Sequence, residues 1–559
     1  MLPRGPEPAA GPAAAATGSR AQCAARDRRA LAALALFVAL TALHTWPLAT
    51  APGTLGRTDN ADAQLNAWVL AWVAHQVGRD PVHLFDANIF YPERNTLAFS
   101  EHLFVPAMLG APLSWAGAPP VLVHNLVLLA GMALTGWATS LVLARWTGSW
   151  RAGVLAGSVA AFNAHTLTRL PHVQAMHVEF LPLALLALDR LLERPRVRTS
   201  LALAVSYALQ ALCSGYLLVF TTLALGVGAL VRASEWLAPS RAKRALPAIA
   251  LAAVIAAVIC APFLRPYAVA RSEQGLRRSM SEVTMFSASL RDYWTTGSRL
   301  HGALWTRRVP RGQDSLFPGV VPLALGLGAI VSGLAWRDRR ARLLLAAGAA
   351  AFVCSFGPKV PVYGWLYEWL TPLQGLRGAA RFGYLVIFAV GGLAAFALAA
   401  LERAWRQHAP RLAAWSAVAL VAAVNLEAAR APLGYTRFEG IPRVYDVLAT
   451  VDHAVVAEVP FPPANRTPRN AALVLASTRH WHPLLNGYSG FVPESYVRHA
   501  EELAGFPDAR AMATLRRLGV THVVVHVRRG PALEAELRDR PEFVLLAAGP
   551  EQRVYRLAD

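Results

Sequence analysis

Residues 57–102 read RTDNADAQLNAWVLAWVAHQVGRDPVHLFDANIFYPERNTLAFSEH and directly follow the first long hydrophobic segment of the chain. Much of the remaining sequence is Ala, Leu and Val, so this stretch stands out by its polar side chains: Asp59, Asp62, Asn66, Asp86, Asn88, Glu93, Glu101 and His102. Carboxylates next to membrane segments are costly unless they lie in water or serve a function. The stretch is therefore either a solvated loop or a functional site.

Three of these polar residues recur at helical spacing. Asp59, Asp62 and Asn66 stand at positions i, i+3 and i+7, which share one face of a helix. An apolar stripe lies beside them, made of Leu65, Trp68, Val69 and Trp72. Tryptophans on one side and acids on the other are typical of a helix at the membrane–water interface. We therefore predict an interfacial helix followed by an aromatic loop, with Asn66 as a substrate-binding residue and four candidate catalytic residues: Asp62, Asp59, Glu101 and His102.

The composition indicates an α-helical polytopic membrane protein. Of 559 residues, 55% are hydrophobic and 16% are charged, and the mean hydropathy is +0.36. A soluble protein carries about 25% charged residues, and several apolar runs here are long enough to cross a bilayer as helices. The net charge of +20 does not indicate nucleic-acid binding, because the arginines are concentrated in short loops between apolar runs.

About eleven apolar segments are candidate membrane spans: 30–49, 120–144, 152–167, 178–192, 199–213, 215–232, 245–264, 316–335, 341–356, 382–402 and 411–429. Clusters of Arg and Lys precede the first segment and follow the second, fourth, sixth, eighth and tenth. All these clusters then fall on one side of the membrane, which the positive-inside rule assigns to the cytoplasm. We predict a multi-pass protein of the inner (plasma) membrane with a cytoplasmic N-terminus and an extracytoplasmic C-terminus.

The same count divides the chain into three parts. Residues 1–28, rich in Ala, Pro, Gly and Arg, are predicted to be a disordered basic cytoplasmic N-terminus. Residues 29–430 hold the membrane segments and a long first outer loop at 50–119. The first apolar segment lacks a convincing cleavage site and is predicted to be a retained helix. Residues 431–559 follow the last segment and are predicted to lie outside the cytoplasm.

Residues 431–559 predict a small α/β domain. Apolar runs shorten to strand length in AVVAEVPF, THVVVHV and FVLLAAG, and the helical pattern ARAMATLRRLG ends at Gly519 just before THVVVHV. This region contains no Gly-rich phosphate loop and no nucleophile elbow. The stretch 479–491, RHWHPLLNGYSGF, is aromatic and polar, which would suit a carbohydrate or another loop.

Two outer loops are basic, against the positive-inside trend. Loop 265–315 carries Arg271 and Arg277 among several arginines, and loop 357–381 is also basic; both contain Tyr and Trp. Such a mixture suits an anionic lipid head group, because the planar fork of Arg bonds two phosphate oxygens at once. The alternative is an aromatic belt with arginines that extend toward the interface. We take Arg271 and Arg277 as candidate substrate-binding residues.

The segment 161–180, AFNAHTLTRLPHVQAMHVEF, contains three histidines and one acid: His165, His172, His177 and Glu179. A metal site would need tighter ligand spacing and a supporting carboxylate. We therefore predict hydrogen-bonded histidines at the mouth of the helical bundle and no metal site.

The acidic first loop, about eleven spans, basic outer loops and a C-terminal outer domain together resemble the GT-C superfamily of integral-membrane glycosyltransferases. The bacterial groups that it looks most like are dolichyl-phosphate-mannose–protein mannosyltransferase-like and lipid A galacturonosyltransferase-like proteins. LVLARWTGSWRAGVLAGSVAAF at 141–162 is similar to the loop between their second and third spans. The resemblance covers about residues 30–430. The sequence departs from it in carrying Asp-x-x-Asp instead of an adjacent acidic pair.

This resemblance implies a polyprenyl-phosphate-linked sugar donor and transfer on the outer face to a glycan, lipid or protein acceptor of the envelope. It also implies that a first-loop acid is the catalytic base, Asp62 before Asp59, and that Arg377 and Arg381 hold the donor phosphate. The sequence points to no cofactor with certainty and leaves the use of a divalent cation open. Membrane lipids are expected partners, and nucleic acid is not.

Two other classes of function are weighed against this one. A transporter of lipid or polysaccharide predicts charges in the middle of spans and paired half-helices in repeated halves, and the sequence shows few such charges and no convincing repeat. A non-catalytic envelope assembly protein would use its outer domain as a binding module and would tolerate loss of both aspartates.

Overall fold

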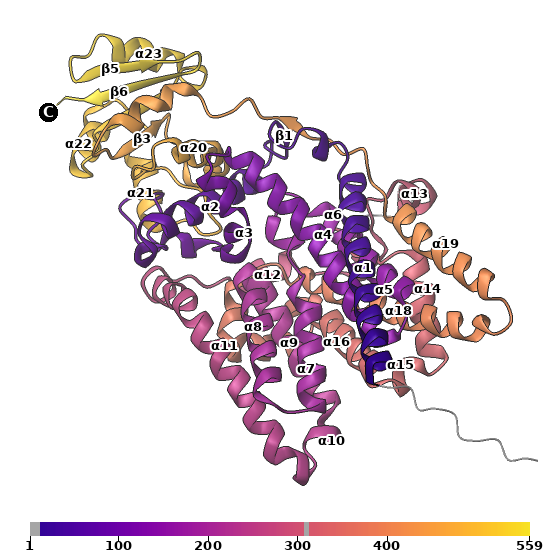
Figure 1. The fold of residues 1–559 in the computed structure, drawn as a ribbon. Helices are drawn as coiled ribbons and strands as arrows, with labels where there is room; N and C mark the ends of the chain where they lie inside the picture. The colour runs from indigo at the N-terminus through magenta and orange to yellow at the C-terminus, as the bar shows by residue number, and fades with distance from the viewer. Residues whose placement is uncertain (1–11, 307–311, 559) are drawn as a thin grey trace, which may run out of the picture.

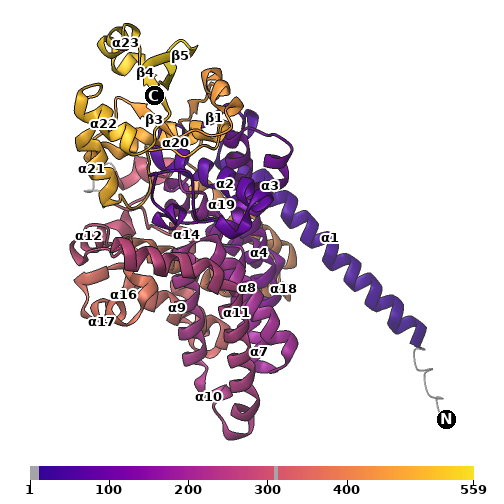
Figure 2. The same cartoon turned by 90° about the vertical axis from the view of Figure 1, so that its left-hand side faces the viewer.

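The structure is a computed structural model that describes residues 12–306 and 312–558. Long helices form one bundle, and a smaller mixed domain at the C-terminus covers one end of it (Figure 1). A second view shows that the N-terminal helix leans away from the rest of the bundle (Figure 2). The first outer loop lies between the bundle and the C-terminal domain in both views.

Within the described residues, every predicted span overlaps a helix of the bundle: α1 (Pro12–His44), α4 (Pro120–Thr147), α5 (Trp150–Ala161), α7 (Phe180–Glu193), α8 (Val197–Cys213), α9 (Gly215–Val231), α11 (Pro239–Gln274), α14 (Val320–Val331), α16 (Arg339–Ser355), α18 (Gly383–Arg406) and α19 (Pro410–Ala428). In this part of the chain, four helices are long and apolar enough to cross a membrane: α4, α11, α18 with its preceding turn, and α19. Shorter apolar helices include α3 (Phe104–Trp115), α8, α9 and α14. The number of about eleven spans stays a prediction.

Two boundaries differ from the sequence-based expectation. Helix α1 begins at Pro12, upstream of the predicted start of the first span at residue 30, and the alanine content of residues 12–28 favours a helix; residues 1–11 lie outside the described residues, and the disorder of the N-terminus stays a prediction. The predicted segment 152–167 is interrupted after Ala161. Asn163 causes the break, because its side-chain amide donates to the carbonyls of Val159 and Ala160 and its Oδ1 caps the next short helix, α6 (Ala164–Thr168).

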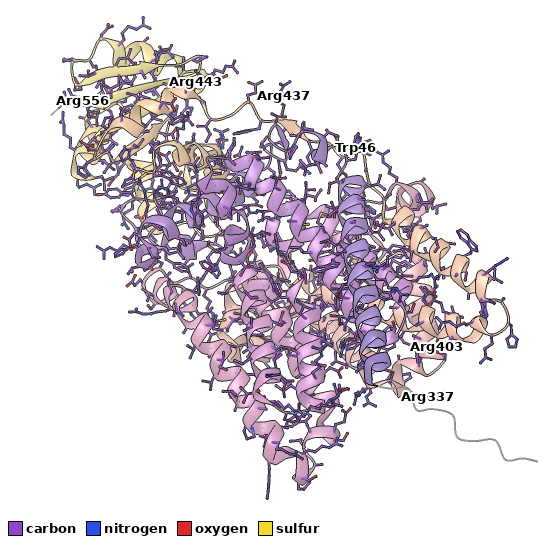
Figure 3. All side chains as sticks on the ribbon, viewed as in Figure 1. Trp46, Arg337, Arg403, Arg437, Arg443 and Arg556 are labelled. Carbon is purple, nitrogen blue, oxygen red and sulfur yellow. The ribbon has the colours of Figure 1, made fainter. Side chains whose placement is uncertain are left out.

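Short helices complete the outer and inner loops of the bundle: α10 (Ala233–Trp236), α12 (Met280–Met285), α13 (Arg299–His301), α15 (Leu334–Arg337) and α17 (Pro361–Trp369). Arg337 and Arg403 lie at the end of the bundle that is remote from the C-terminal domain (Figure 3). Trp46, just after the C-terminal end of α1, lies toward the opposite end of the bundle. The two basic residues therefore share one end of the molecule, as their assignment to one side of the membrane requires.

The C-terminal domain contains a four-stranded sheet with the order β3 (Val456–Val459), β4 (His522–His526), β6 (Gln552–Leu557) and β5 (Phe543–Ala548). Strands β3 and β4 are parallel, and the other pairs are antiparallel. The expected helix–strand unit is present: α22 (Ala509–Arg517) ends before Gly519, whose φ of +67° only glycine adopts easily, and β4 follows. The remaining helices are α20 (Ala471–Ala476), α21 (Glu494–Glu502) and α23 (Pro531–Arg538).

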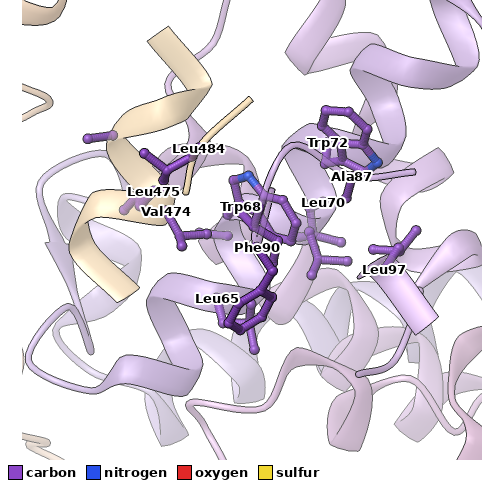
Figure 4. Packing of buried hydrophobic residues seen from close by; sticks show 14 of the residues in the cluster. Leu65, Trp68, Leu70, Trp72, Ala87, Phe90, Leu97, Val474, Leu475 and Leu484 are labelled. Atoms are coloured by element: carbon purple, nitrogen blue, oxygen red, sulfur yellow. The ribbon is translucent and has the colours of Figure 1, made fainter. Parts of the chain in front are cut away.

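Helix α2 (Ala61–Arg79) packs inside the protein between the bundle and the C-terminal domain. Its apolar stripe is buried, and Trp68 lies against Val474 and Leu475 of α20 (Figure 4). This corrects the prediction of an interfacial helix, because the tryptophans are covered by protein and not by lipid. A two-residue pairing of β1 (Leu55–Gly56) with β2 (Thr436–Arg437) also joins the first loop to the start of the C-terminal region.

Candidate functional site

Asp62 lies in the first turn of α2, where the sequence itself provides a helix start. The side chain of Asn60 caps the helix by accepting hydrogen bonds from the backbone N–H groups of Asp62 and Ala63, at 2.9 and 3.3 Å. A carboxylate in this position is stabilised by the partial positive charge of the helix N-terminus. The Asp62 side chain keeps about a third of its surface exposed. It is therefore anchored and still accessible to a substrate.

Two side chains from distant parts of the chain contact the Asp62 carboxylate. The hydroxyl of Tyr488, in the C-terminal domain, donates to Oδ1 at 2.7 Å. The ring of His172, from the histidine-containing segment, places Nε2 3.3 Å from Oδ2. Three segments that are far apart in the sequence thus meet at one carboxylate.

The surroundings of Asp62 keep it ionised. Burial acts to raise its pKa, but the hydrogen bond from His172, the charge that His172 gains at low pH, the hydrogen bond from Tyr488 and the charge of Arg377 outweigh this effect and hold the pKa well below its usual range. Burial lowers the pKa of His172, with a further contribution from the charge of Arg381. At neutral pH, His172 is then a neutral ring that can donate one hydrogen bond to the carboxylate.

Asn66 is buried and positions the histidine segment of this site. Its side chain is only 6% exposed, and its amide donates to the carbonyl of Pro171 at 2.8 Å. Pro171 immediately precedes His172, so the bond holds the histidine segment against α2 one turn beyond Asp62. This contact gives Asn66 a structural role, and its role in substrate binding stays a prediction.

Asp59 lies outside the helix and apart from this cluster. Because Asn60 occupies the cap position, α2 begins at Ala61, and Asp59 does not share a helical face with Asp62. Its carboxylate pairs with Nε of Arg57 at 3.3 Å, and its side chain is 47% exposed. The structure thus separates the two aspartates that the spacing had placed together.

Glu101 and His102 are engaged elsewhere. Glu101 accepts a hydrogen bond from Gln174 at 2.7 Å and another from Ser214 at the start of α9. His102 is 5% exposed, lies among aromatic rings and accepts from the backbone N–H of Phe104 at 3.0 Å. Burial lowers the pKa of His102 to about 4. Both residues join loop to helix, and their catalytic role stays a prediction.

The predicted arginines divide into two groups. Arg377 lies close enough to Asp62 and Tyr488 for its charge to lower the pKa of both groups. Its guanidinium lies 5.2 Å from the centre of the Phe286 ring and 4.0 Å from Glu282. Arg381 stacks on Tyr216 at 4.2 Å, and among the described residues no carboxylate pairs with it. These two cations therefore flank the Asp62 cluster.

Arg271 and Arg277 form the second group. Arg277 is exposed and stacks on Tyr367, with its guanidinium 5.3 Å from the ring centre. Arg271 is partly exposed in the last turn of α11. The interactions of the described residues do not bring either arginine to Asp62. A neighbour that the sequence did not single out, Arg278, instead donates to the carbonyl of Gly490 and so joins this loop to the C-terminal domain.

The site also contains residues that sequence reasoning missed. His172 lay in a segment interpreted as hydrogen-bonded histidines, and Tyr488 lay in the aromatic stretch 479–491, but neither pattern named Asp62 as the partner. Within the described residues, no group of three or more His, Cys, Asp and Glu side chains is arranged to hold a metal ion.

Comparison with known proteins finds solved structures with a similar fold. No sequence-family profile and no curated protein matches the chain. The structure is similar to the Archaeoglobus fulgidus oligosaccharyltransferase in its apo form, with 14% identity, coverage of 89% of this chain and 70% of that chain, and a TM-score of 0.53. It is also similar to the oligosaccharyltransferase AglB from the same organism in complex with an inhibitory peptide and a dolichol-phosphate, with 14% identity, coverage of 95% and 74%, and a TM-score of 0.51.

AglB has a GT-C fold, so these similarities show that this chain has a GT-C fold as well. The GT-C fold expected from the sequence is confirmed. The two bacterial groups that the sequence resembles stay predictions.

Proposed function

We propose that the chain is a membrane glycosyltransferase that moves a sugar from a polyprenyl-phosphate donor to a glycan, lipid or protein acceptor of the cell envelope, on the extracytoplasmic face. The observation that carries this proposal is the Asp62 carboxylate, held ionised at a helix start and flanked by Arg377 and Arg381. The GT-C fold supports it, and so does the dolichol-phosphate in the AglB complex, because that ligand is a lipid phosphate.

The two kinds of side chain meet the two needs of the reaction. An acceptor hydroxyl attacks the anomeric carbon, the bond from that carbon to the phosphate oxygen breaks, and the phosphate leaves with the electron pair. Asp62 accepts the proton of the hydroxyl as the new glycosidic bond forms. Arg377 and Arg381 stabilise the negative charge that develops on the leaving phosphate. His172 orients the carboxylate through Oδ2, which leaves Oδ1 for the acceptor.

Tyr488 occupies Oδ1 in the present structure. A general base works best when its pKa lies near the working pH, whereas the resting Asp62 carboxylate has a depressed pKa. An acceptor hydroxyl that replaces the Tyr488 hydroxyl at Oδ1 donates the hydrogen bond along which its proton is transferred. The C-terminal domain therefore holds Oδ1 until the acceptor binds, through the phenol of Tyr488.

Tyr488→Phe is expected to raise the pKa of Asp62, because the carboxylate loses a hydrogen-bond donor. The wild-type carboxylate is protonated only at a pH well below its usual range, so activity is lost on its acid side only there. In the variant, the acid limb of the profile of kcat/KM against pH moves to higher pH. Tyr496→Phe is the matched control, since Tyr496 bonds Asn470 and a carbonyl inside the same domain. An acid limb at the same pH in Tyr488→Phe as in the wild type would show that Tyr488 does not lower the pKa of the catalytic base.

Arg381→Ala is expected to raise the KM for the lipid-linked donor by about 10- to 100-fold, as loss of a charge-assisted hydrogen bond of about 1.5–3 kcal/mol predicts. Arg381→Lys should recover only part of the loss, because an ammonium keeps the charge but not the fork. The measurement is donor-dependent transfer in reconstituted membranes, with the exposed Arg510→Ala of α22 as control. A KM for donor equal to the wild type in Arg381→Ala contradicts a phosphate-binding role.

Mass spectrometry of envelope glycans and lipid-linked sugars tests the proposed function as a whole. Strains that carry the wild-type gene, a deletion, and Asp62→Asn at equal protein level are compared. Loss of one glycoform in both the deletion and the variant, with accumulation of its lipid-linked donor, identifies the transferred sugar. A variant that behaves like the wild type while the deletion does not would favour transport or envelope assembly instead.

A further inference from the structure

A cavity lies away from Asp62, between the first outer loop and the C-terminal domain. Its volume is about 370 Å³, within the range of sites that hold small ligands. Its walls combine aromatic and polar side chains, among them Trp72, Tyr91, Trp481, Asp86, Asn88 and Arg94. We call it the Trp481 cavity. A cavity of this kind, with flat rings and a few hydrogen-bonding groups, is typical of small-molecule recognition.

Trp481 is held in an unusual backbone conformation at this cavity. Its φ is +60°, in the left-handed region that side chains rarely adopt. Its ring stacks on His75 with centroids 4.1 Å apart and lies 6.0 Å from Trp72. Burial, with a smaller contribution from the charge of Arg79, lowers the pKa of His75 to about 4, so the stack is uncharged at neutral pH. Backbone strain of this kind is concentrated at functional positions.

The polar wall of the cavity is formed by Asp86, Asn88 and Arg94. Asn88 is only 7% exposed, and its side-chain amide donates to the carbonyl of His482 at 3.1 Å and to Ser477 Oγ at 3.2 Å. Its side-chain oxygen has no hydrogen-bond partner among the described residues. Because that oxygen is fully buried, it does not face the cavity. The polar wall groups within reach of a ligand's hydroxyls are therefore the partly buried Asp86 and the exposed Arg94.

We propose that the Trp481 cavity is a saccharide-binding subsite that holds one ring of an oligosaccharide acceptor. The C–H face of a sugar ring packs against Trp481 and Tyr91, and its hydroxyls bond Asp86 and Arg94. This assignment of the acceptor class rests on the proposed transferase function. The aromatic stretch 479–491, whose composition suits a carbohydrate, contributes one wall.

The spacing along α2 indicates how large the acceptor is. Trp72 follows Asp62 by ten residues, which is about 15 Å along a helix axis. A single sugar at Trp72 cannot also place a hydroxyl at Asp62, but a short chain of linked sugars can span this distance. The acceptor class is therefore an oligosaccharide, bound by a ring remote from the reacting hydroxyl.

Saturation-transfer NMR tests this subsite directly. The full chain is placed in lipid nanodiscs, because detergents with sugar head groups would compete, and is titrated with cellotriose, chitotriose, mannotriose and a pentapeptide of Gly, Ser and Asn. The Asp62→Asn variant is measured in parallel without donor lipid. We expect at least one trisaccharide, and not the peptide, to bind both proteins.

Trp481→Gly removes the stacking ring while the backbone keeps a conformation that glycine adopts freely. We expect about tenfold weaker binding of the trisaccharide, the size of a lost aromatic contact. Arg94→Ala, at an exposed wall position, should weaken binding without affecting folding, and Trp336→Ala on α15, at the opposite end, should leave it unchanged.

Three results would overturn the subsite. The first is no saccharide signal in the wild type, and the second is a trisaccharide signal in Trp481→Gly and Arg94→Ala that equals the wild-type signal. The third is a peptide signal in the wild type that Trp481→Gly removes. Trisaccharide binding needs neither the donor lipid nor the Asp62 carboxylate, so the NMR titration can succeed even if the chain is not a transferase. The glycan comparison of the Asp62→Asn strain does not depend on the NMR titration, so it can support the transferase even if no trisaccharide binds.

Discussion

Asp62→Asn is expected to slow sugar transfer by about 10²–10⁴-fold, the usual contribution of a positioned general base. The amide has nearly the same shape, and it can still accept from Tyr488 at Oδ1, but it cannot take up the proton of the acceptor hydroxyl. The loss should therefore appear in kcat, with KM for both substrates within a few fold of the wild type. The measurement is steady-state transfer in reconstituted membranes with purified lipid-linked sugar.

Asp59→Asn provides the matched control for this experiment. It makes the same chemical change three residues away, on a half-exposed carboxylate that pairs only with Arg57 among the interactions described. Its rate should stay close to that of the wild type. Equal losses in the two variants would mean that the acidic loop acts through its charge as a whole and not through Asp62 as a base.

Trp68→Ala is expected to destabilise the contact between the first outer loop and the C-terminal domain by about 3–5 kcal/mol. Trp68 is 1% exposed and is among the largest fully buried side chains. It packs against Val474 and Leu475 of α20 (Figure 4). Truncation leaves a cavity where α2 meets the C-terminal domain. The thermal unfolding midpoint should fall, and limited proteolysis should release the C-terminal domain more rapidly than in the wild type.

Trp68→Phe is the control that separates the loss of side-chain volume from the loss of the indole N–H. The indole N–H of Trp68 is buried without a hydrogen-bond partner among the described residues. Phe therefore removes an unsatisfied donor and leaves a smaller cavity, so its cost should be well below that of Ala. Release of the C-terminal domain at the wild-type rate in Trp68→Ala would show that this packing does not hold the domain.

Much of the fold follows from local patterns in the sequence. The apolar segments form helices close to the predicted bounds, and the alternation of α22, Gly519 and β4 appears where the C-terminal pattern placed it. These features depend on residues near each other in the chain, such as a run of apolar side chains or a glycine after a helix. The same patterns were misleading for α2, because the spacing of tryptophans along a helix is the same whether lipid or protein covers them.

The candidate site was predictable only in part. Asp62 and the two late arginines were named from the sequence, and the structure places all three in one region. His172 and Tyr488 could not be assigned, because their role exists only when segments more than a hundred residues away fold against Asp62. Glu101 and His102 are held by hydrogen bonds to Gln174, Ser214 and Phe104, and their catalytic role stays a prediction.

The sequence alone determined the class of structure: a helical membrane protein whose polar chemistry is concentrated in the first outer loop and whose end is a small α/β domain. Periodicity and composition report burial, and burial decides which segments become helices or strands. Only the tertiary structure decided which acid has partners. It closed the C-terminal domain over α2, so that Tyr488 and His172 hold Asp62 while Asp59 stays in solvent, because a hydrogen bond depends on distances in space that spacing along the chain does not set.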